Sequence, residues 1–349
     1  MFRKFTVFIV GAGAGVDLDM PTGEQLTEQI SKKLDIRSEF GERKSGDVEI
    51  VRGLNARARL DGVDPNELFR IARGISKGIH HTKSIDNYCH THRENPNVQK
   101  VAKIAIVQSI LKAERASPLF VNQTKHPFVF RDENKVRRSW LQNFMQILQE
   151  GTNASTNLKG LFNNLIIFNF NYDRCVEHYL YYALQELYGI QPASAADLIE
   201  GLKIHHPYGR VGKLPWQEGA KRKVEFGASP SNDEADIAAL SENIRTYNEE
   251  VAPSKNLRIF TTLMASADRF VFLGFHFHRQ NIELIAAPVS ELAVRHAYAT
   301  TVGRSDSDLP IIEGRIRNML PTRKEFFSHI EKKLDCTQLF REYGTTFEE

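Results

Sequence analysis

The sequence predicts an α/β protein with a doubly wound, Rossmann-like and mostly parallel sheet, into which a large helical segment is inserted. Three observations support this fold class. The chain opens with an apolar strand, a glycine loop and a helix, which is the first unit of such folds. Further short apolar runs return only after residue 160, and the stretch between them is polar with helical spacing. A sheet with helices on both faces fits this order.

The opening unit is the most clearly patterned. Phe5 to Val10 is almost wholly apolar and rich in β-branched and aromatic residues, as expected for a strand buried on both faces. Glycines follow from Gly11, and Thr22 is a suitable N-cap for the next helix. Leucine or isoleucine then recurs every fourth residue at positions 26, 30 and 34, which predicts one apolar helix face.

The organisation of the rest follows from where apolar runs stop and return. We predict a Rossmann domain from residues 1–34 and 161–349, with residues 35–160 as a mostly helical insertion. In that insertion, Val136, Trp140, Phe144 and Leu148 have helical spacing, and Ser84 to Asn97 reads as a surface loop. After it we predict strands at Leu165–Phe168, Leu202–His205, Phe270–Leu273 and Ala297–Val302, a helix at Cys175–Tyr188, a long loop plus a helix at Lys213–Asn256, and one or two amphipathic helices from Thr322 onward.

Composition excludes several classes of protein. The net charge of +3, from 46 basic and 43 acidic residues, is too small for a dedicated nucleic-acid binder, and Lys135, Arg137 and Arg138 fit a solvated helix face. The three cysteines are widely spaced, so neither a disulfide framework nor a cysteine zinc site is expected, and no metal is predicted. No apolar run reaches 18 residues and the N-terminus has no cleavage-type site, which favours a cytoplasmic location without membrane association.

Polar or glycine residues follow four of the predicted strands, at the points where each strand ends. In open parallel sheets, ligands bind beyond the carboxyl ends of the strands, so we expect these groups to gather at one site. They are Gly11 to Gly15, then Asn169, Asn171 and Asp173, then His205, His206 and Tyr208, and finally Gly274, His276, His278 and Asn281.

The glycine loop alone is open to two interpretations. Glycines allow a backbone to approach a pyrophosphate, but they also make plain tight turns. The run is not a full G-x-G-x-x-G because Val16 stands at the third glycine position. No acidic residue ends a second strand about 20 residues later, so a conventional dehydrogenase is disfavoured.

Four segments carry a resemblance to one known family: VFIVGAGAGVDLDMPTG, IIFNFNYDRCVEHY, KIHHPYG and FVFLGFHFHRQNIEL. Together they resemble sirtuin-like NAD hydrolase domains of bacterial phage-defence systems. The first segment resembles the opening of that family, and the second resembles its asparagine–aspartate motif. KIHHPYG falls where the family has its catalytic histidine, and FVFLGFHFHRQNIEL resembles its glycine–phenylalanine motif. The resemblance spans residues 7 to 285 in family order. Two departures are Tyr208 and Gly15, at positions where relatives often have histidine and serine.

The resemblance implies NAD as substrate and assigns roles to the residues. Asn171 is expected to bond a ribose hydroxyl and water, and His206, or alternatively His205, to act as base. The remaining contacts expected with the cofactor come from Gly11, Ala12, Gly13, Thr22, Asp173, Gly274, His276 and Asn281, with His276 and His278 near the adenine ribose.

Structural interpretations remain beside these roles. Asn169, Asn171 and Asp173 also suit a turn and a helix N-cap, and Asn281 suits a cap of the following helix. The two histidine pairs also suit simple packing.

Three functions therefore compete. The first is an NAD hydrolase that releases nicotinamide and ADP-ribose, acting in anti-phage defence by NAD depletion. The second is an NAD-dependent protein deacylase, which the missing CxxC pairs of the sirtuin zinc subdomain disfavour. The third is a non-catalytic nucleotide-binding scaffold. An unrestrained hydrolase would drain its own cell, so we expect a homo-oligomer or a regulatory partner such as a HerA-type ATPase, since the chain has no P-loop motif of its own.

Overall fold

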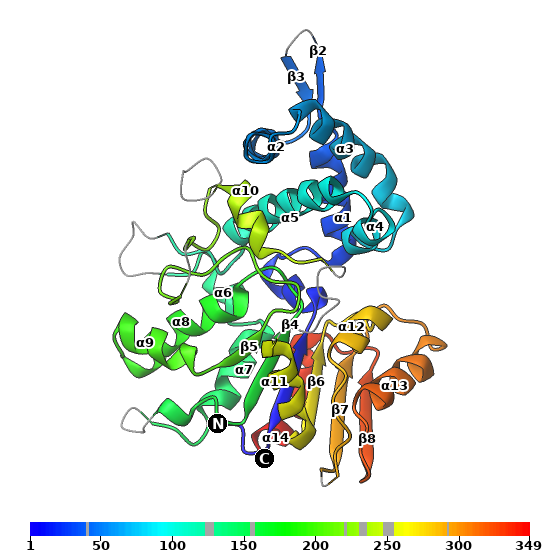
Figure 1. The fold of residues 1–349 in the computed structure, drawn as a ribbon. Coiled ribbons are helices and arrows are strands. Elements are labelled where there is room, and N and C mark those ends of the chain that lie inside the picture. Colours follow the sequence, from blue (N-terminus) through cyan, green and yellow to red (C-terminus); the bar gives the residue numbers. More distant parts are fainter. Residues whose placement is uncertain are drawn as a thin grey trace.

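The computed structural model describes residues 1–39, 42–122, 129–153, 158–219, 222–229, 236–246, 255–291 and 293–349. A six-stranded parallel sheet forms its lower half in Figure 1, and a group of helices rises above the sheet. Within the described ranges, no helix combines the length and the apolar character needed to cross a bilayer.

The sheet has the Rossmann strand order, and the predicted fold class is confirmed. Its order is β5-β4-β1-β6-β7-β8, which is 3-2-1-4-5-6 when the insertion's hairpin is left out. The strands are β1 (Thr6–Val10), β4 (Leu165–Asn169), β5 (Lys203–His205), β6 (Arg269–Leu273), β7 (Arg295–Thr300) and β8 (Phe326–Glu331). Strand order reverses between β1 and β6, so their carboxyl ends define the switch point at which such sheets bind ligands.

The central strands are the apolar runs of the sequence. Every residue of β1, β4 and β6 is buried, because neighbouring strands cover both edges and helices cover both faces. β1 is in register with both neighbours, with Thr6 opposite Leu165 and Arg269. The same register brings the residues that follow Val10, Asn169 and Leu273 together at one rim.

Aromatic side chains attach the covering helices to the sheet. On one face, Phe8 packs against Phe144 of α7 (Trp140–Gln149) and Phe340 of α14 (Cys336–Glu348). On the other face, Phe168 packs against Phe260 of α11 (Lys255–Leu263). Helix α13 (Asp308–Met319) covers β8 on that face, where the Ser328 hydroxyl donates to Glu313.

The helical insertion forms a body of its own above the sheet (Figure 1). α1 (Gly23–Leu34) packs on α3 (Pro65–Gly78) and α5 (Pro96–Ala116), so it belongs to this body although it follows β1. α7 lies inside the 35–160 range predicted for the insertion, yet it packs on the sheet. The helices and strands of the body are α1, a hairpin of β2 (Arg37–Glu39) and β3 (Glu42–Ser45), α2 (Val48–Asp61), α3 (Pro65–Gly78), α4 (Ile85–Thr91) and α5 (Pro96–Ala116).

Two predictions are wrong. The chain from Thr322 contains strand β8 before helix α14, where only helices are expected from the sequence. β8 is an edge strand with half-exposed residues, so it lacks the continuous apolar run that marks the buried strands. Ser84 to Asn97 is not a loop, because Ser84 caps α4 and Asn95 caps α5.

The other predicted elements occur close to their expected places. Thr22 caps α1 through a capping box with Gln25, and α8 spans Cys175–Tyr188 as predicted. The predicted loop and helix of Lys213–Asn256 lie partly outside the described residues. The remaining helices are α6 (Glu133–Val136), α9 (Pro192–Glu200), α10 (Ile237–Leu240) and α12 (Arg279–Leu284).

Candidate functional site

A large cavity opens at the switch point, between the sheet and the helical insertion. Its volume is about 1120 Å³, which is enough for a dinucleotide. Loops after β1, β4, β6 and β7 form one side, and α1 and residues 80–87 of the insertion form the other. The cavity therefore brings together most of the residues that the sequence predicts for one site: Gly11, Ala12, Gly13, Thr22, Asn171, Asp173, Gly274, His276, His278 and Asn281.

The glycines of the first loop are required by contact with the loop after β6. A Cβ on Gly11 would lie 2.6 Å from the Gly274 oxygen, and one on Gly13 would lie 2.8 Å from the Gly274 Cα. Gly274 itself has φ +56°, and a Cβ there would meet the Ala14 nitrogen at 2.1 Å. The two backbones are joined by a hydrogen bond from Gly13 N to the Gly274 oxygen. Close packing of two loops therefore explains these glycines without a ligand.

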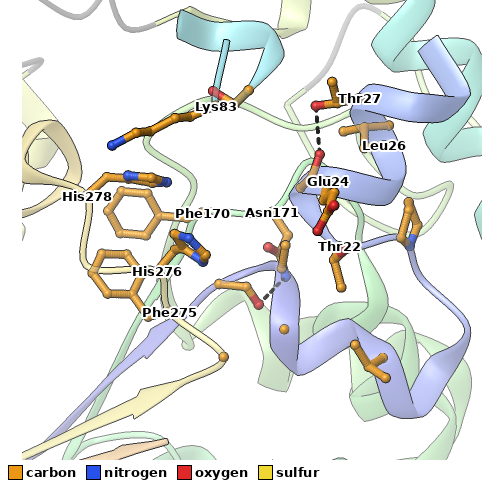
Figure 2. Close-up of a pocket in the computed structure, with 18 of the residues that line it drawn as sticks. Thr22, Glu24, Leu26, Thr27, Lys83, Phe170, Asn171, Phe275, His276 and His278 are labelled. Carbon is orange, nitrogen blue, oxygen red and sulfur yellow. Dashed lines mark hydrogen bonds between the residues drawn. The ribbon is translucent and has the colours of Figure 1, made fainter. Parts of the chain in front are cut away.

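Asn171 lies on the cavity wall beside the glycine loop. Its Nδ2 donates to the Gly11 oxygen at 3.2 Å, and its backbone N donates to Asn169 Oδ1 at 3.1 Å. Among the residues that the structure describes, its Oδ1 has no hydrogen-bond partner. Figure 2 shows the side chain between the two walls of the cavity. The amide is therefore held in place and keeps an acceptor and one N–H for a ligand.

Asp173 combines a structural contact with a place on the wall. Its Oδ1 accepts from Cys175 N at 3.0 Å in the turn before α8, whose N-cap is Arg174, so the turn interpretation fits Asp173 and the N-cap interpretation is wrong. Burial raises the pKa of this carboxyl above its ordinary value. Asp173 also lines the cavity, so the two expectations do not exclude one another.

The histidines after β5 do not line the cavity. The His206 side chain is 6% exposed and lies behind Asn171, with Nδ1 3.1 Å from the Asn171 carbonyl oxygen and Nε2 3.0 Å from Glu177 Oε1. A carbonyl and a carboxylate only accept, so both ring nitrogens donate and neither has a lone pair to take a proton. Glu177 also accepts from Arg210. Burial would raise the pKa of Glu177, but the charges of His206 and Arg210 hold it at about 2.

His205 faces the opposite side of the strand. Its ring packs 5.4 Å from that of Phe260 and 6.0 Å from that of Phe168, and burial lowers its pKa to about 4. Within the described ranges, its Nε2 is buried and has no partner. The packing interpretation of the sequence fits this position.

Tyr208, which stands where relatives of the resembled family often have histidine, does line the cavity. Its hydroxyl donates to Asn281 Oδ1 at 2.5 Å. Asn281 lies inside the short helix α12, whose N-cap is His278, so it does not cap that helix. The pair links the loop after β5 to helix α12.

His276 and His278 line the cavity from the loop after β6, and His80 lines it from the insertion. The ring centroids of His276 and His278 are 4.6 Å apart, and both rings lie on the wall opposite Thr22 and Glu24 (Figure 2). Burial lowers the pKa of both rings, and the pKa of His278 falls to about 4 beside His276, Lys83 and Arg304. Both rings are therefore neutral near pH 7.

The sequence analysis missed the residues that the insertion contributes. Lys83 and Asp86 enter the cavity from the segment that begins α4. Asp86 accepts from the Tyr172 hydroxyl at 3.0 Å, and burial raises its pKa to about 6. No local pattern marks either residue, because α4 is short and polar. Glu24 and Glu28 of α1 add negative charge to the cavity.

Two further observations concern metals and charge. In the described part of the chain, no group of three histidine, cysteine, aspartate or glutamate side chains is placed to hold a metal ion. Lys135 and Arg137 pair with Asp19 and Glu133, as a solvated helix face would.

No protein-family model, curated protein or solved structure matches the chain.

Proposed function

We propose that the protein is a cytoplasmic NAD hydrolase that cleaves the nicotinamide–ribose bond in the switch-point cavity. The observation that carries the proposal is the fixed amide of Asn171 on the wall of a dinucleotide-sized cavity. The bond that anchors it to Gly11 leaves its acceptor oxygen uncommitted among the described residues. An amide in this setting suits the ribose hydroxyls and a water molecule at the anomeric carbon.

The reaction makes modest demands on the protein. The bond between the anomeric carbon and the pyridinium nitrogen breaks, and its electron pair neutralises the leaving nicotinamide, so no acid is needed. Water forms the new C–O bond and loses a proton. The transition state has oxocarbenium character, which the acidic side of the cavity at Glu24 and Asp86 would favour electrostatically.

In this reaction the Asp86 carboxylate accepts the proton of the attacking water. This carboxyl lies in the cavity, it is held by Tyr172, and its pKa of about 6 leaves it mostly ionised at pH 7. Turnover should therefore decline as the pH falls through about 6, because the protonated carboxyl cannot accept. His206 becomes a positioning residue, since its ring holds the backbone of Asn171 from behind.

Nicotinamide release from NAD tests the proposal. The pure protein is incubated with NAD alone, with an acetylated peptide, and with the proteins encoded next to it, because we propose that an oligomer or a HerA-type ATPase restrains the enzyme. Release without peptide is expected, and Asn171→Ala should reduce it at least 100-fold, about 3 kcal/mol of transition-state stabilisation. The control is Asn66→Ala, an exposed residue at the start of α3 that does not line the cavity. Release that needs the peptide would indicate a deacylase, and undiminished release by Asn171→Ala would contradict the assignment.

One observation favours a second function, a nucleotide-binding scaffold without turnover. Tyr208 occupies the position of the resembled family's histidine, and its hydroxyl is committed to Asn281. The scaffold predicts that ADP-ribose and NAD bind equally and that no condition releases nicotinamide.

A further inference from the structure

The loop after β6 has an uncommon backbone that is fixed from two sides. Gly274 and Phe277 both have positive φ, +56° and +48°, which is rare for a phenylalanine. The Phe277 side chain is buried, and its carbonyl accepts from Arg315 Nη1 at 2.8 Å. The His276 carbonyl accepts from Arg304 Nη2 at 3.1 Å. Such strain persists only where the surroundings over-determine it, and it is concentrated at functional sites.

This backbone presents both imidazoles to the cavity. The buried Phe277 separates them, so the His276 and His278 rings emerge on the same side with centroids 4.6 Å apart. Figure 2 shows the Lys83 side chain extending from the insertion toward His278. The charged groups that act on the two rings from the neighbouring segments are all cations: Lys83, Arg304 and Arg315.

We propose that His276, His278, Lys83 and Arg304 form a subsite for the diphosphate of the dinucleotide. The subsite rests on the proposed function only in the choice of a dinucleotide as ligand. Imidazole N–H groups and the cations Lys83 and Arg304 suit phosphate oxygens, whereas Glu24 and Glu28 on the α1 side of the cavity would repel them. The chain would therefore bind the diphosphate on the β6 side of the cavity and place the ribose next to nicotinamide near Asn171.

The subsite makes binding depend on protons. A bound diphosphate favours the imidazolium form, so it raises the pKa of His278 from about 4 in the free protein. At any pH between the pKa of His278 in the free protein and its higher pKa in the complex, the protein takes up protons when the ligand binds. Affinity for the diphosphate should therefore increase as the pH falls from 7 toward 5.5.

Titration calorimetry with ADP-ribose, inorganic diphosphate and adenosine tests the subsite. ADP-ribose is used for the pH series because its diphosphate diester does not titrate in this range. We expect the double variant His276→Ala/His278→Ala, and separately Lys83→Ala, to weaken diphosphate and ADP-ribose binding at least tenfold and to leave adenosine binding unchanged. The matched controls are His81→Ala and Lys77→Ala, exposed residues of the insertion that do not line the cavity.

The outcomes separate the subsite from the hydrolase. In two buffers of different ionisation enthalpy, the native protein should take up protons on binding ADP-ribose. The variant His276→Gln/His278→Gln, which keeps N–H donors, should bind without that uptake. Equal diphosphate affinity in native protein and double variant would overturn the subsite, as would failure of the native protein to bind diphosphate. If the protein binds diphosphate but releases no nicotinamide under any condition, the subsite proposal holds and the hydrolase proposal is contradicted.

Discussion

Two pairs of histidines lie at the ends of two strands of the same sheet, and their surroundings differ. His205 ends β5 and packs against Phe260, and His206 follows it and is fixed between Asn171 and Glu177. His276 and His278 follow β6, and both face the cavity.

Backbone conformation explains the difference. Successive residues of an extended strand point to opposite faces, so the adjacent pair at the end of β5 is divided between two faces. The segment of His276 and His278 is not extended, because Phe277 has φ +48°, and this backbone with Phe277 buried places both rings on the cavity side. The resemblance to a family motif favours the first pair, whereas the backbone geometry favours the second as ligand contacts.

The largest effect should come from breaking the ion cluster behind Asn171. Glu177→Ala leaves His206 and Arg210 buried or half-buried without their carboxylate, and removing one partner of a buried pair costs about 3–5 kcal/mol. Urea unfolding measures this loss in the free energy of unfolding. Glu283→Ala, which breaks an exposed pair with Arg279, is the control and should change stability by less than about 1 kcal/mol. A loss for Glu177→Ala as small as the control's would show that the cluster does not hold the β5 side.

Gly274→Ala should be nearly as destabilising, at about 3 kcal/mol or more. The new Cβ would lie 2.1 Å from the Ala14 nitrogen and would force the β1 and β6 loops apart. Gly303→Ala is a matched control, because Gly303 also has positive φ (+80°) but its Cβ would meet nothing within 4 Å. The control should lose only the backbone strain, about 1 kcal/mol. Equal losses in a urea series would mean that the close approach of the loops is unimportant.

The free energy of unfolding should also depend on pH through Glu177. The folded pKa of Glu177 is about 2, below the ordinary value of 4.5, so the carboxylate stabilises the fold above pH 4.5. This contribution, up to about 3 kcal/mol, is lost as the pH falls from 4.5 toward 2. Glu177→Gln should flatten the stability profile in that window when unfolding is followed by circular dichroism. An unchanged profile would contradict the charge assignment of the cluster.

Smaller losses of stability are expected from single alanine substitutions in the two histidine pairs. His206→Ala removes two hydrogen bonds and leaves Glu177 short of a donor, which should cost about 2 kcal/mol. His276→Ala changes a ring that faces the cavity and should alter stability by no more than about 0.5 kcal/mol. Thermal unfolding measures both. Similar values for the two variants would remove the distinction between a fixed and a ligand-facing histidine.

The sheet and part of the cavity could be predicted from the sequence. Fully buried strands such as β1 and β6 leave continuous apolar runs, and residues at their ends share a rim because parallel strands end together. The edge strand β8 leaves no such run. The insertion's contribution could not be predicted, because Lys83 and Asp86 reach the cavity through packing of α1 on α3 and α5, a long-range arrangement with no local pattern.

The same limit applies to the side chains at the strand ends. The sequence indicates which residues reach the rim, but it does not give the hydrogen bonds that turn His206 inward behind Asn171. Nor does the sequence mark the positive φ of Phe277, which places both rings of the second pair in the cavity.

A crystal structure of Asn171→Ala protein soaked with NAD tests the central claim most directly, because it does not depend on turnover or on a partner. We predict one intact dinucleotide in the switch-point cavity, with its diphosphate beside His276 and His278 and its nicotinamide ribose beside residue 171. An empty cavity at saturating NAD, or a dinucleotide bound elsewhere on the chain, would contradict the account.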